Sequence, residues 1–482
     1  MTQPCDLDAV EARRLIGLKE LSPVELLDSC LARIEEVDGA LNAITASDAK
    51  GARGAAKTAE KAVLKGEPLG SLHGLPIAVK DLQATRGLRT TWGSLLYKDH
   101  VPKEDDPMVA NLRAAGGIIF AKTNTPEFGA GANTTNRVFG ATGNPFDPKK
   151  TCGGSSGGSA VAVATGMAPL ATGSDHGGSL RTPAAFCGIV GFRPSPGLIP
   201  RLTSPVGLLP MPVGGPMGRT VADAHLLLKA QLRIDKRDPF SSGDVLHLPG
   251  TLSGADLGSL RVAFSTDLGC APIDKGIART FKARCRAIGR FFGEAQRRDP
   301  ELKGVHDAFD VLRAIHFVAA HKERLEKSRD LLGPNVISNT ERGLKYTLPD
   351  VARAHAAQTA LYKTFVEFFD EVDILICPAA AVSPFPLSQL FVESINGEKM
   401  PTYMRWLAVT YALTMALPAA CCLPCGSDET GMPFGIQVVG PNGSDALVLE
   451  VSHALEQALS GNTSTARPVA RLAGLRRGRR KS

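Results

Sequence analysis

The chain has 482 residues, of which 43% are hydrophobic and 21% are charged, and this composition is typical of a folded globular protein. Its net charge of +7 is concentrated at one end, because five basic residues lie in the last seven positions and the charge without them is +2. No basic face or aromatic interleaving accompanies these residues. The composition therefore argues against a nucleic-acid partner, and it predicts a basic, disordered tail over 471–482.

The ten cysteines are scattered along the chain, and Asp6, Asp8 and Glu11 occupy the place where a secretory signal would need an apolar run. We therefore expect a cytoplasmic protein whose thiols are reduced. Cys422 and Cys425 form a C-x-x-C pair, but no second pair and no suitably spaced histidine accompanies them. We predict buried thiols here, with neither a metal nor a cofactor.

The N-terminal part is predicted to be helical over about 8–65. Ser22-Pro23-Val24-Glu25 combines an N-cap residue, a proline at the first helical position and a capping-box glutamate. Apolar residues at helical spacing follow up to Ile34, and a second helix, rich in Ala and Lys, is predicted over 48–65.

Short apolar strands and helices alternate in the central part of the chain. Strands are predicted over 75–81 and 118–122, with a helix over 107–115 between them. This alternation is typical of a mostly parallel sheet with helices packed on it. The connection over 194–216 is rich in proline and has no regular period, so we expect it to be irregular.

The second half continues with a surface insertion and further strands and helices. The insertion is expected over 234–258, helices over 275–294, 305–331, 350–370 and 445–459, and strands over 260–264, 373–378 and 434–440. The longest apolar run, 407–424, is interrupted by polar residues and is short for a bilayer span, so we predict a buried helix followed by a strand and no membrane partner.

No shift in composition divides the chain into independent domains. We therefore expect a single domain over 1–470. Its parts are N-terminal helices over about 8–65, a catalytic core over about 70–230, an insertion with helices over about 234–370 and a C-terminal core over about 371–465.

Two segments rich in Gly and Ser, 153–159 and 177–179, bracket an apolar run. A flexible linker is disfavoured, because the first segment leads directly into the apolar stretch 160–164. That segment also contains the G-x-S-x-G pattern of α/β-hydrolases, but no apolar strand precedes it. A phosphate-binding loop is a further weak alternative, since no G-K-[ST] follows.

Lys80 ends one of the predicted apolar strands. Such a lysine is either a solvated strand tip or a buried amine, and burial would lower its pKa so that it acts as a base near neutral pH. Next to a serine flanked by glycines, a buried amine would form a Ser–Lys pair, which is a known alternative to Ser–His.

The second segment has the sequence Asp175-His176-Gly177-Gly178-Ser179 and precedes a predicted helix. Successive backbone N–H groups near a helix start form a nest that can hold an oxyanion, and Ser179 lies at its end as a candidate nucleophile. His176 as a general base is a weaker alternative, because it lies only three positions before Ser179.

These segments resemble the amidase signature family, a family of serine hydrolases with a Ser–cis-Ser–Lys triad. The resemblance covers about 15–465. Residues 153–159 match the family's GGSSGGS, and residues 173–186 match its G-[ST]-D-x-G-G-S-x-R-x-P-A-A-F. The implied fold is α/β, an α/β/α layered sandwich with a large mixed central sheet.

The resemblance also implies roles for individual residues. Ser179 is implied as the nucleophile, Ser155 as the bridging serine on a cis peptide bond, and Lys80 as the base. The resemblance implies an oxyanion hole made of the backbone N–H groups of His176, Gly177, Gly178 and Ser179. It implies supporting roles, near the lysine or in fixing the loop, for Ser156, Asp175 and Arg181.

The implied reaction is hydrolysis of a small or aryl carboxamide to a carboxylic acid and ammonia or an amine, through an acyl-enzyme. Thr182 stands where the A-type subunit of tRNA-dependent amidotransferases usually has Gln, which favours a free-standing amidase. That subunit remains an alternative, and so does a catalytically silent binding protein on the same fold. His176 stands where the family most often has Thr, so the pocket differs there.

The expected partner is a small-molecule amide, and family analogy implies a homodimer formed through the N-terminal helices. The sequence does not identify the amide. The substrate pocket is expected to involve the loop over 378–386, the region over 403–413 and the residues Phe128, Gly131, Asn133 and Thr134.

Overall fold

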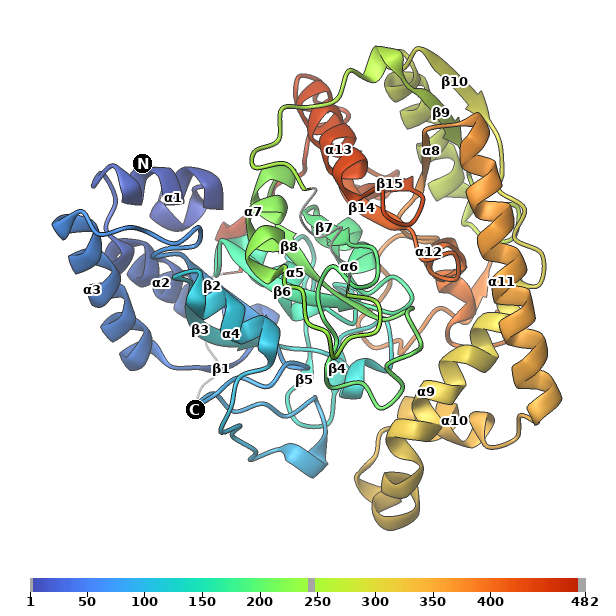
Figure 1. The fold of residues 1–482 in the computed structure, drawn as a ribbon, viewed down its shortest axis with the longest axis horizontal. Coiled ribbons are helices and arrows are strands. Elements are labelled where there is room, and N and C mark those ends of the chain that lie inside the picture. Colours follow the sequence, from blue (N-terminus) through green and yellow to red (C-terminus); the bar gives the residue numbers. More distant parts are fainter. Residues whose placement is uncertain (1–2, 242–247, 476–482) are drawn as a thin grey trace.

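The computed structural model describes residues 3–241 and 248–475, and a single sheet of 11 strands runs through it (Figure 1). The strand order is β1-β3-β2-β6-β8-β7-β14-β15-β11-β9-β10. The bounds of these strands are β1 (Ile44–Ser47), β2 (Pro76–Lys80), β3 (Ile118–Thr123), β6 (Leu170–Asp175), β7 (Val190–Arg193), β8 (Val213–Gly218), β9 (Arg261–Phe264), β10 (Glu294–Arg297), β11 (Ile374–Pro378), β14 (Ala419–Ser427) and β15 (Pro433–Gly440).

The sheet is mixed, as predicted. Strand β2 pairs in parallel with β3 and β6, and β9 pairs in parallel with β10 and β11. The strands between these two groups pair in antiparallel fashion, from β6 through β8, β7, β14 and β15 to β11. The carboxyl ends of β2 and β6 therefore lie side by side, and both strands lead into site residues.

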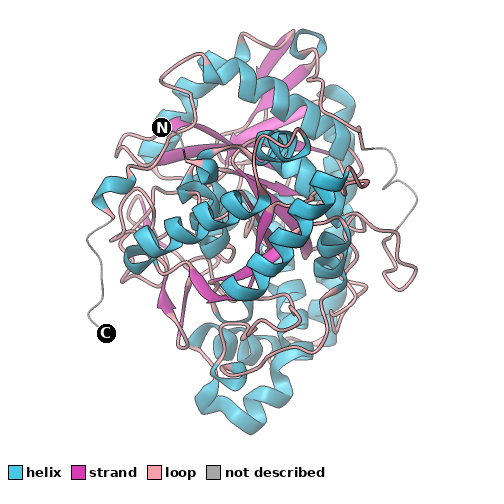
Figure 2. Ribbon diagram, turned by 90° about the vertical axis from the view of Figure 1, so that its left-hand side faces the viewer, coloured by secondary structure: helices cyan, strands magenta, loops and turns pink. Residues whose placement is uncertain are grey.

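Successive side chains of a strand point to opposite faces of the sheet, and here they enter two different hydrophobic clusters. On β2, Ala78 belongs to one cluster, and Ile77 and Val79 belong to the other. On β11, Cys377 and Ile376 divide in the same way. The sheet is therefore covered on both faces, and Figure 2 shows strands running through the interior with helices around them.

The helices form the two outer layers of an α/β/α sandwich, which confirms the predicted fold class. The first cluster receives apolar side chains mainly from α2 (Pro23–Leu41), α5 (Gly157–Thr165), α6 (Arg181–Cys187), α9 (Val305–Ser328), α11 (Leu348–Glu371) and α12 (Ala408–Thr414). The second receives them mainly from α1 (Ala9–Gly17), α4 (Pro107–Ala114), α7 (Val221–Gln231), α8 (Lys275–Gly289) and α13 (Asp445–Ser460). The other elements are α3 (Ala49–Lys65), α10 (Pro334–Gly343) and the short pairs β4 (Thr135–Asn136) with β5 (Gly140–Ala141) and β12 (Ser394–Ile395) with β13 (Glu398–Lys399).

The start of α2 follows from its sequence. The Ser22 hydroxyl accepts a hydrogen bond from the Val24 N–H at 3.0 Å, and the Glu25 carboxylate accepts one from the Ser22 N–H at 3.1 Å. This is the predicted capping box, and it satisfies N–H groups that have no partner within the helix. The predicted helix over 48–65 is α3, whose N-cap is Asp48.

Three predictions of local structure were wrong. The N-terminal part was expected to be helical over about 8–65, but the strand β1 lies between α2 and α3. The connection over 194–216 was expected to be irregular, but β8 begins inside it. Glycine and proline are uncommon inside strands, so the sequence of β8 did not predict one. Such a strand fits where neighbouring backbones approach closely. The helix expected over 275–294 ends at Gly289, and β10 follows. That strand is a polar edge strand with mostly exposed side chains, so its sequence has no apolar period.

Part of the expected insertion, 242–247, and most of the expected basic tail, 476–482, lie outside the described residues. The first residues of that tail include a short 3-10 turn, Leu472–Gly474. Within 3–241 and 248–475, none of the helices is both long enough and apolar enough to cross a bilayer.

We expect Gly215→Ala to destabilise the fold. A Cβ atom at Gly215 on β8 would lie 2.4 Å from the carbonyl oxygen of Phe192 and 2.5 Å from Leu180 Cδ1, so the buried strand would have to shift. Overpacking of this kind costs about 1–3 kcal/mol. A lower midpoint in thermal unfolding, measured by calorimetry, checks this.

The matched control is Gly54→Ala in the exposed part of α3. No heavy atom lies within 4 Å of a Cβ at that position. Because alanine favours the helix over glycine by about 0.5–1 kcal/mol, the midpoint should rise. A Gly215→Ala protein as stable as the parent would contradict the close packing of β8.

Candidate active site

The side-chain amine of Lys80 lies at the centre of a cluster of hydroxyl groups. Lys80 is the last residue of β2 and is fully buried. Its Nζ atom lies 2.7 Å from Ser155 Oγ, 2.8 Å from Ser156 Oγ and 2.9 Å from Ser174 Oγ. The sequence left open whether Lys80 is a solvated strand tip, and the structure excludes that interpretation.

Burial lowers the pKa of Lys80 to about 7, and the negative charge of Asp175 offsets only part of this effect. The cause is desolvation, which disfavours the charged amine, while the three hydroxyl partners carry no charge to hold the proton. An amine with this pKa is present in substantial amounts as the neutral base at neutral pH.

A second lysine, Lys122, shows why Lys80 is special. It lies on β3 next to β2 and is also fully buried. Its Nζ atom donates to the carbonyl of Gln83 and to Thr85 Oγ1 at 2.8 Å, and it lies 4.0 Å from Asp81 Oδ1. Lys122 thus has a carboxylate neighbour and no serine among its partners. These partners come from a distant part of the chain, so the sequence alone could not distinguish Lys122 from Lys80.

The first Gly/Ser segment forms a turn that leads into α5. The peptide bond between Gly154 and Ser155 is cis, the geometry that the resemblance implies. Ser156 precedes the helix, and its Oγ accepts from Lys80 and lies 3.3 Å from the carbonyl oxygen of Ser174. The Ser156 N–H donates to the carbonyl of Ser179 at 3.3 Å, which brings the two segments together.

The second segment is the turn between β6 and α6. Gly178 has a φ of +121°, and a Cβ there would lie 2.2 Å from Thr410 Oγ1, so only glycine fits. Thr410 Oγ1 in turn donates to the carbonyl of Gly177 at 2.7 Å, which fixes the turn against α12. The turn is therefore rigid and its backbone N–H groups have defined directions.

The N–H groups of this turn do not all remain available. Gly178 donates its N–H to Asp175 Oδ1 at 2.8 Å. Among the described residues, no acceptor is found for the N–H groups of Gly177 and Ser179. His176 is the first residue of this turn, because β6 ends at Asp175. Of the four N–H groups expected to form an oxyanion hole, that of Gly178 thus has a partner within the protein.

Asp175 is the anchor of the turn, and it is fully buried with Arg181 and Arg193. Arg181 donates to both carboxylate oxygens, at 3.0 and 3.1 Å, and Arg193 Nη1 lies 3.3 Å from Oδ1. Burial alone would raise the pKa of Asp175, but the charges of the two arginines lower it. Arg181 also donates to Gln437 Oε1 at 2.7 Å, which ties the turn to β15.

Ser179 lies at the floor of a cavity of about 680 Å³, together with Ser155 and Ser174. Lys80 and Ser155 are in hydrogen-bond contact, but no hydrogen bond between described residues joins the Ser179 hydroxyl to Ser155. Catalytic hydrogen bonds are often long without substrate and tighten in the complex. The structure thus forms one half of the expected proton path and brings both serines to the same cavity.

Two of the four expected pocket residues, Phe128 and Gly131, line this cavity. Asn133 and Thr134 are not among the described residues that line it. Asn133 donates to the carbonyl of Gln389 at 2.7 Å and accepts from Thr151, and Thr134 donates to the carbonyl of Gly153 at 2.8 Å. These two side chains hold the loop behind the cavity.

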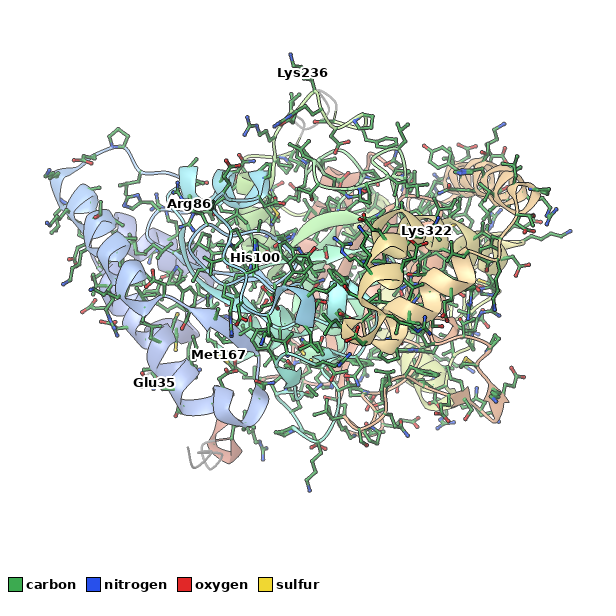
Figure 3. All side chains as sticks on the ribbon, turned by 90° about the horizontal axis from the view of Figure 1, so that it is seen from below. Glu35, Arg86, His100, Met167, Lys236 and Lys322 are labelled. Carbon is green, nitrogen blue, oxygen red and sulfur yellow. The ribbon has the colours of Figure 1, made fainter. Side chains whose placement is uncertain are left out.

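The sequence analysis missed most of the cavity wall. One side is formed by one face of α9, and another by the segment 199–205. The loop that carries Trp92 and Tyr97 closes a third side. In Figure 3, the labelled His100 of this loop and the labelled Lys322 of α9 lie on either side of the middle of the molecule. The sequence showed the helical spacing of α9, but it did not show that one face of this helix lines the cavity.

The fold and the site define an α/β enzyme with a buried lysine–serine cluster at the floor of a cavity. The family model described as Amidase matches residues 25–449. The chain therefore belongs to the amidase family, and its class is that of hydrolases acting on carbon–nitrogen bonds.

Individual relatives agree with this family. The chain is 32% identical over 448 residues to an acylamidase of Rhodococcus erythropolis, covering 92% of this chain and 94% of that protein. It is also 32% identical to the A-type subunit of the glutamyl-tRNA(Gln) amidotransferase of Acidothermus cellulolyticus, covering 94% and 95%. Its fold is similar to the crystal structure of a bacterial aryl acylamidase of the amidase signature family, with a TM-score of 0.86, 26% identity and coverage of 98% and 99%.

We expect Asp175→Asn to destabilise the protein strongly. The substitution leaves two fully buried guanidinium groups, Arg181 and Arg193, without their carboxylate. Breaking a buried ion pair in this way costs about 3–5 kcal/mol. Urea unfolding followed by circular dichroism measures the loss.

The control is Asp373→Asn, which breaks another Asp–Arg pair, with Arg261, whose side chains are 28% and 40% exposed. Water replaces the lost partner there, so a much smaller shift is expected. Equal losses in the two variants would contradict the anchoring role of Asp175.

Proposed function

We propose that the protein is a free-standing amidase that cleaves a carboxamide through an acyl-enzyme on Ser179, with Lys80 as the base and Ser155 as the bridging serine. The observation that carries the proposal is the contact between the buried Lys80 amine and the Ser155 hydroxyl at 2.7 Å. A pKa near 7 gives this amine the proton affinity that a general base needs at neutral pH.

In the proposed mechanism, neutral Lys80 accepts a proton from Ser155 while Ser155 accepts one from Ser179. The Ser179 oxygen attacks the amide carbonyl, and the N–H groups of His176, Gly177 and Ser179 stabilise the oxyanion. Lys80 returns the proton through Ser155 to the leaving nitrogen as the carbon–nitrogen bond breaks. A water molecule then hydrolyses the acyl-enzyme by the same proton path, which releases the carboxylic acid and restores Ser179.

Supporting roles follow from contacts in the same region. Ser156 orients the amine as a second hydroxyl partner at 2.8 Å. Asp175 and Arg181 hold the turn that carries the nucleophile, and the N–H of Gly178 belongs to this anchor instead of the oxyanion hole. The proposed substrate class is a small or aryl carboxamide, in keeping with the acylamidase relatives.

An A-type subunit of a tRNA-dependent amidotransferase is a second candidate, favoured by relatives of that kind at 30–32% identity. Co-purification of partner subunits and transfer of ammonia to an acyl-tRNA would decide for it. A catalytically silent binding protein is a candidate of another class. A fluorophosphonate probe distinguishes it, because a silent site would leave Ser179 unlabelled.

We further propose that residues 1–470 form one amidase domain, that the protein acts in the cytoplasm, and that it forms a homodimer. The sheet that continues from β1 to β10 supports a single domain. The dimer rests on family analogy, and we place its interface on the N-terminal helices, where Val10 and Leu64 are 42% and 62% exposed. Sedimentation equilibrium would test the dimer.

We expect Ser179→Ala to abolish amide hydrolysis, because no other oxygen replaces the nucleophile. The loss should reach a factor of about 10³ or more in kcat, with the thermal midpoint unchanged. Hydrolysis of 4-nitroacetanilide, followed by the absorbance of 4-nitroaniline, measures it. The matched control is Ser204→Ala, a serine of the same cavity wall that does not contact Lys80, and it should keep activity within a few-fold. An active Ser179→Ala protein would refute the assignment.

The activity should rise with pH through an apparent pKa of about 7. Below this pH Lys80 is protonated and has no free electron pair to accept a proton, and above it the neutral amine predominates. The pH dependence of kcat/KM between pH 5 and 9 measures this. Lys80→Met should lower kcat by orders of magnitude and remove the rise. A Lys80→Met profile that keeps the same midpoint would assign the base to another group.

A further inference from the structure

One face of α9 forms a wall of the cavity. Six of the side chains that it contributes are spaced by three or four positions along the helix, so they lie on one face: Arg313, His316, Phe317, Ala320, His321 and Arg324. In Figure 1, α9 lies on the right-hand side of the molecule, beside α10. Two cations thus face the cavity from a single helix.

Among the described residues, Arg313 is buried without a carboxylate in ion-pair contact, although Asp310 interacts with it electrostatically. It is 6% exposed, and its guanidinium donates to Tyr403 OH at 2.6 Å and to Asn339 Oδ1. The group also lies over the Phe317 ring, at 4.5 Å from the centroid. All these partners are neutral, and a buried charge without a counter-ion is costly. Asp310, one turn earlier on α9, forms its ion pair with Arg342 instead, at 3.8 Å.

Arg324 and Arg201 add to the positive charge of the wall. Arg324 donates to Tyr97 OH at 3.3 Å and lies 5.2 Å from the centroid of the Phe128 ring. Arg201, in the segment 199–205, donates its Nη1 to the carbonyl of Leu209 at 3.0 Å. In the part of the chain that the structure describes, no ion pair includes Arg201, Arg313 or Arg324.

The acidic groups on the cavity wall do not balance these three cations. Asp175 is neutralised by Arg181 and Arg193. Asp106 accepts from the Met108 N–H at 3.0 Å as the N-cap of α4, and burial raises its pKa. Asp310, Asp238 and Glu323 act electrostatically on Arg313, Arg201 and Arg324, respectively, but none of these carboxylates lines the cavity. The described wall itself therefore carries an excess of positive charge that an anionic ligand would contact directly.

The histidines of the wall are neutral at neutral pH. Burial and the neighbouring arginines lower the pKa of His316 to about 4 and that of His321 to about 3. His176 Nε2 and His316 Nδ1 are buried without a hydrogen-bond partner in the structure. Polar atoms left in this state beside a cavity are available to a polar ligand.

We propose that the substrate is an amide that carries a carboxylate, and that the half-buried Arg324 on α9 binds this carboxylate while the amide lies over Ser179. Arg313 adds positive charge farther along the same wall. Arginine suits this task, because its planar group donates two parallel hydrogen bonds to a carboxylate. The aromatic rings beside both guanidinium groups accommodate the apolar part of the substrate. The inference rests on the proposed amidase function and specifies its substrate class.

Two matched pairs of anilides test the inference. Glutaryl 4-nitroanilide is compared with 5-oxohexanoyl 4-nitroanilide, and 4-acetamidobenzoate with 4-acetylacetanilide. In each pair a methyl ketone replaces the carboxylate, on the acyl side in the first and on the amine side in the second. We expect kcat/KM of the carboxylate compound to exceed that of its ketone at least tenfold in one pair. A ratio near one in both pairs overturns the inference.

Arg324→Gln should bring that ratio down by about tenfold or more and Arg313→Gln by a smaller factor, while the rate of the ketone compound changes a few-fold at most. Arg324 is half-buried, so its variant keeps the test valid if Arg313→Gln fails to fold. The matched control is Lys322→Gln, which removes one exposed cation from the same helix without touching the cavity, and it should keep the parent ratio. A ratio unaffected by both arginine variants overturns the inference.

Binding separates this inference from the proposed function. Calorimetric titration of the Ser179→Ala protein with the same four compounds needs no turnover. Tighter binding of a carboxylate compound than of its ketone, lost in Ser179→Ala/Arg324→Gln, supports the inference even if no amide is hydrolysed. Equal affinities within both pairs overturn it, even if the ketones are hydrolysed by the parent protein in a manner that depends on Ser179.

Discussion

The site depends on one physical condition, the burial of the Lys80 amine among hydroxyl groups instead of carboxylates. Serine hydroxyls accept its hydrogen bonds but provide no negative charge, so desolvation prevails and the pKa falls to about 7. Lys122 on the next strand is equally buried, but Asp81 lies near it and offsets part of the same desolvation. Neighbouring strands thus carry two lysines, and only the one without a contacting carboxylate reaches the cavity serines.

Asp175 lies close enough to Lys80 to raise the pKa of the amine, yet its carboxylate forms ion pairs with two arginines. Arg181 and Arg193 take both of its oxygens, which keeps the carboxylate ionised and compensated. The same carboxylate accepts from the Gly178 and Leu180 N–H groups, so it also fixes the turn that carries Ser179. One buried ion network therefore supports the shape of the turn that carries Ser179 and leaves the lysine free to lose its proton.

The sequence predicted the layers of the fold, most elements and, except for Ser174, the residues of the lysine–serine cluster, because these depend on local signals. The N-cap of α2, the apolar strand before Lys80 and the two Gly/Ser segments are each readable within a few residues. What was missed depends on contacts between distant segments. Strand β8 forms because its glycines tolerate the backbone of β7, and Asn133 turns away from the cavity because the carbonyl of Gln389 accepts its hydrogen bond.

The same division explains why chemistry was easier to predict than substrate. The lysine and serines lie at strand ends and in the turns that follow, whereas the cavity wall comes from α9, the segment 199–205 and the loop around Trp92. A helix of α9's composition has several polar faces, and only packing against α10, α11 and α12 decides which one meets the cavity. In the sequence, Arg313 therefore cannot be distinguished from other arginines on helices. In the structure it is a buried cation beside neutral histidines, so the charge that the face of α9 presents to the cavity at neutral pH comes from its arginines. Because the wall and the proposed base lie on different elements, we expect a change of charge on α9 to alter which amide is bound without altering Lys80.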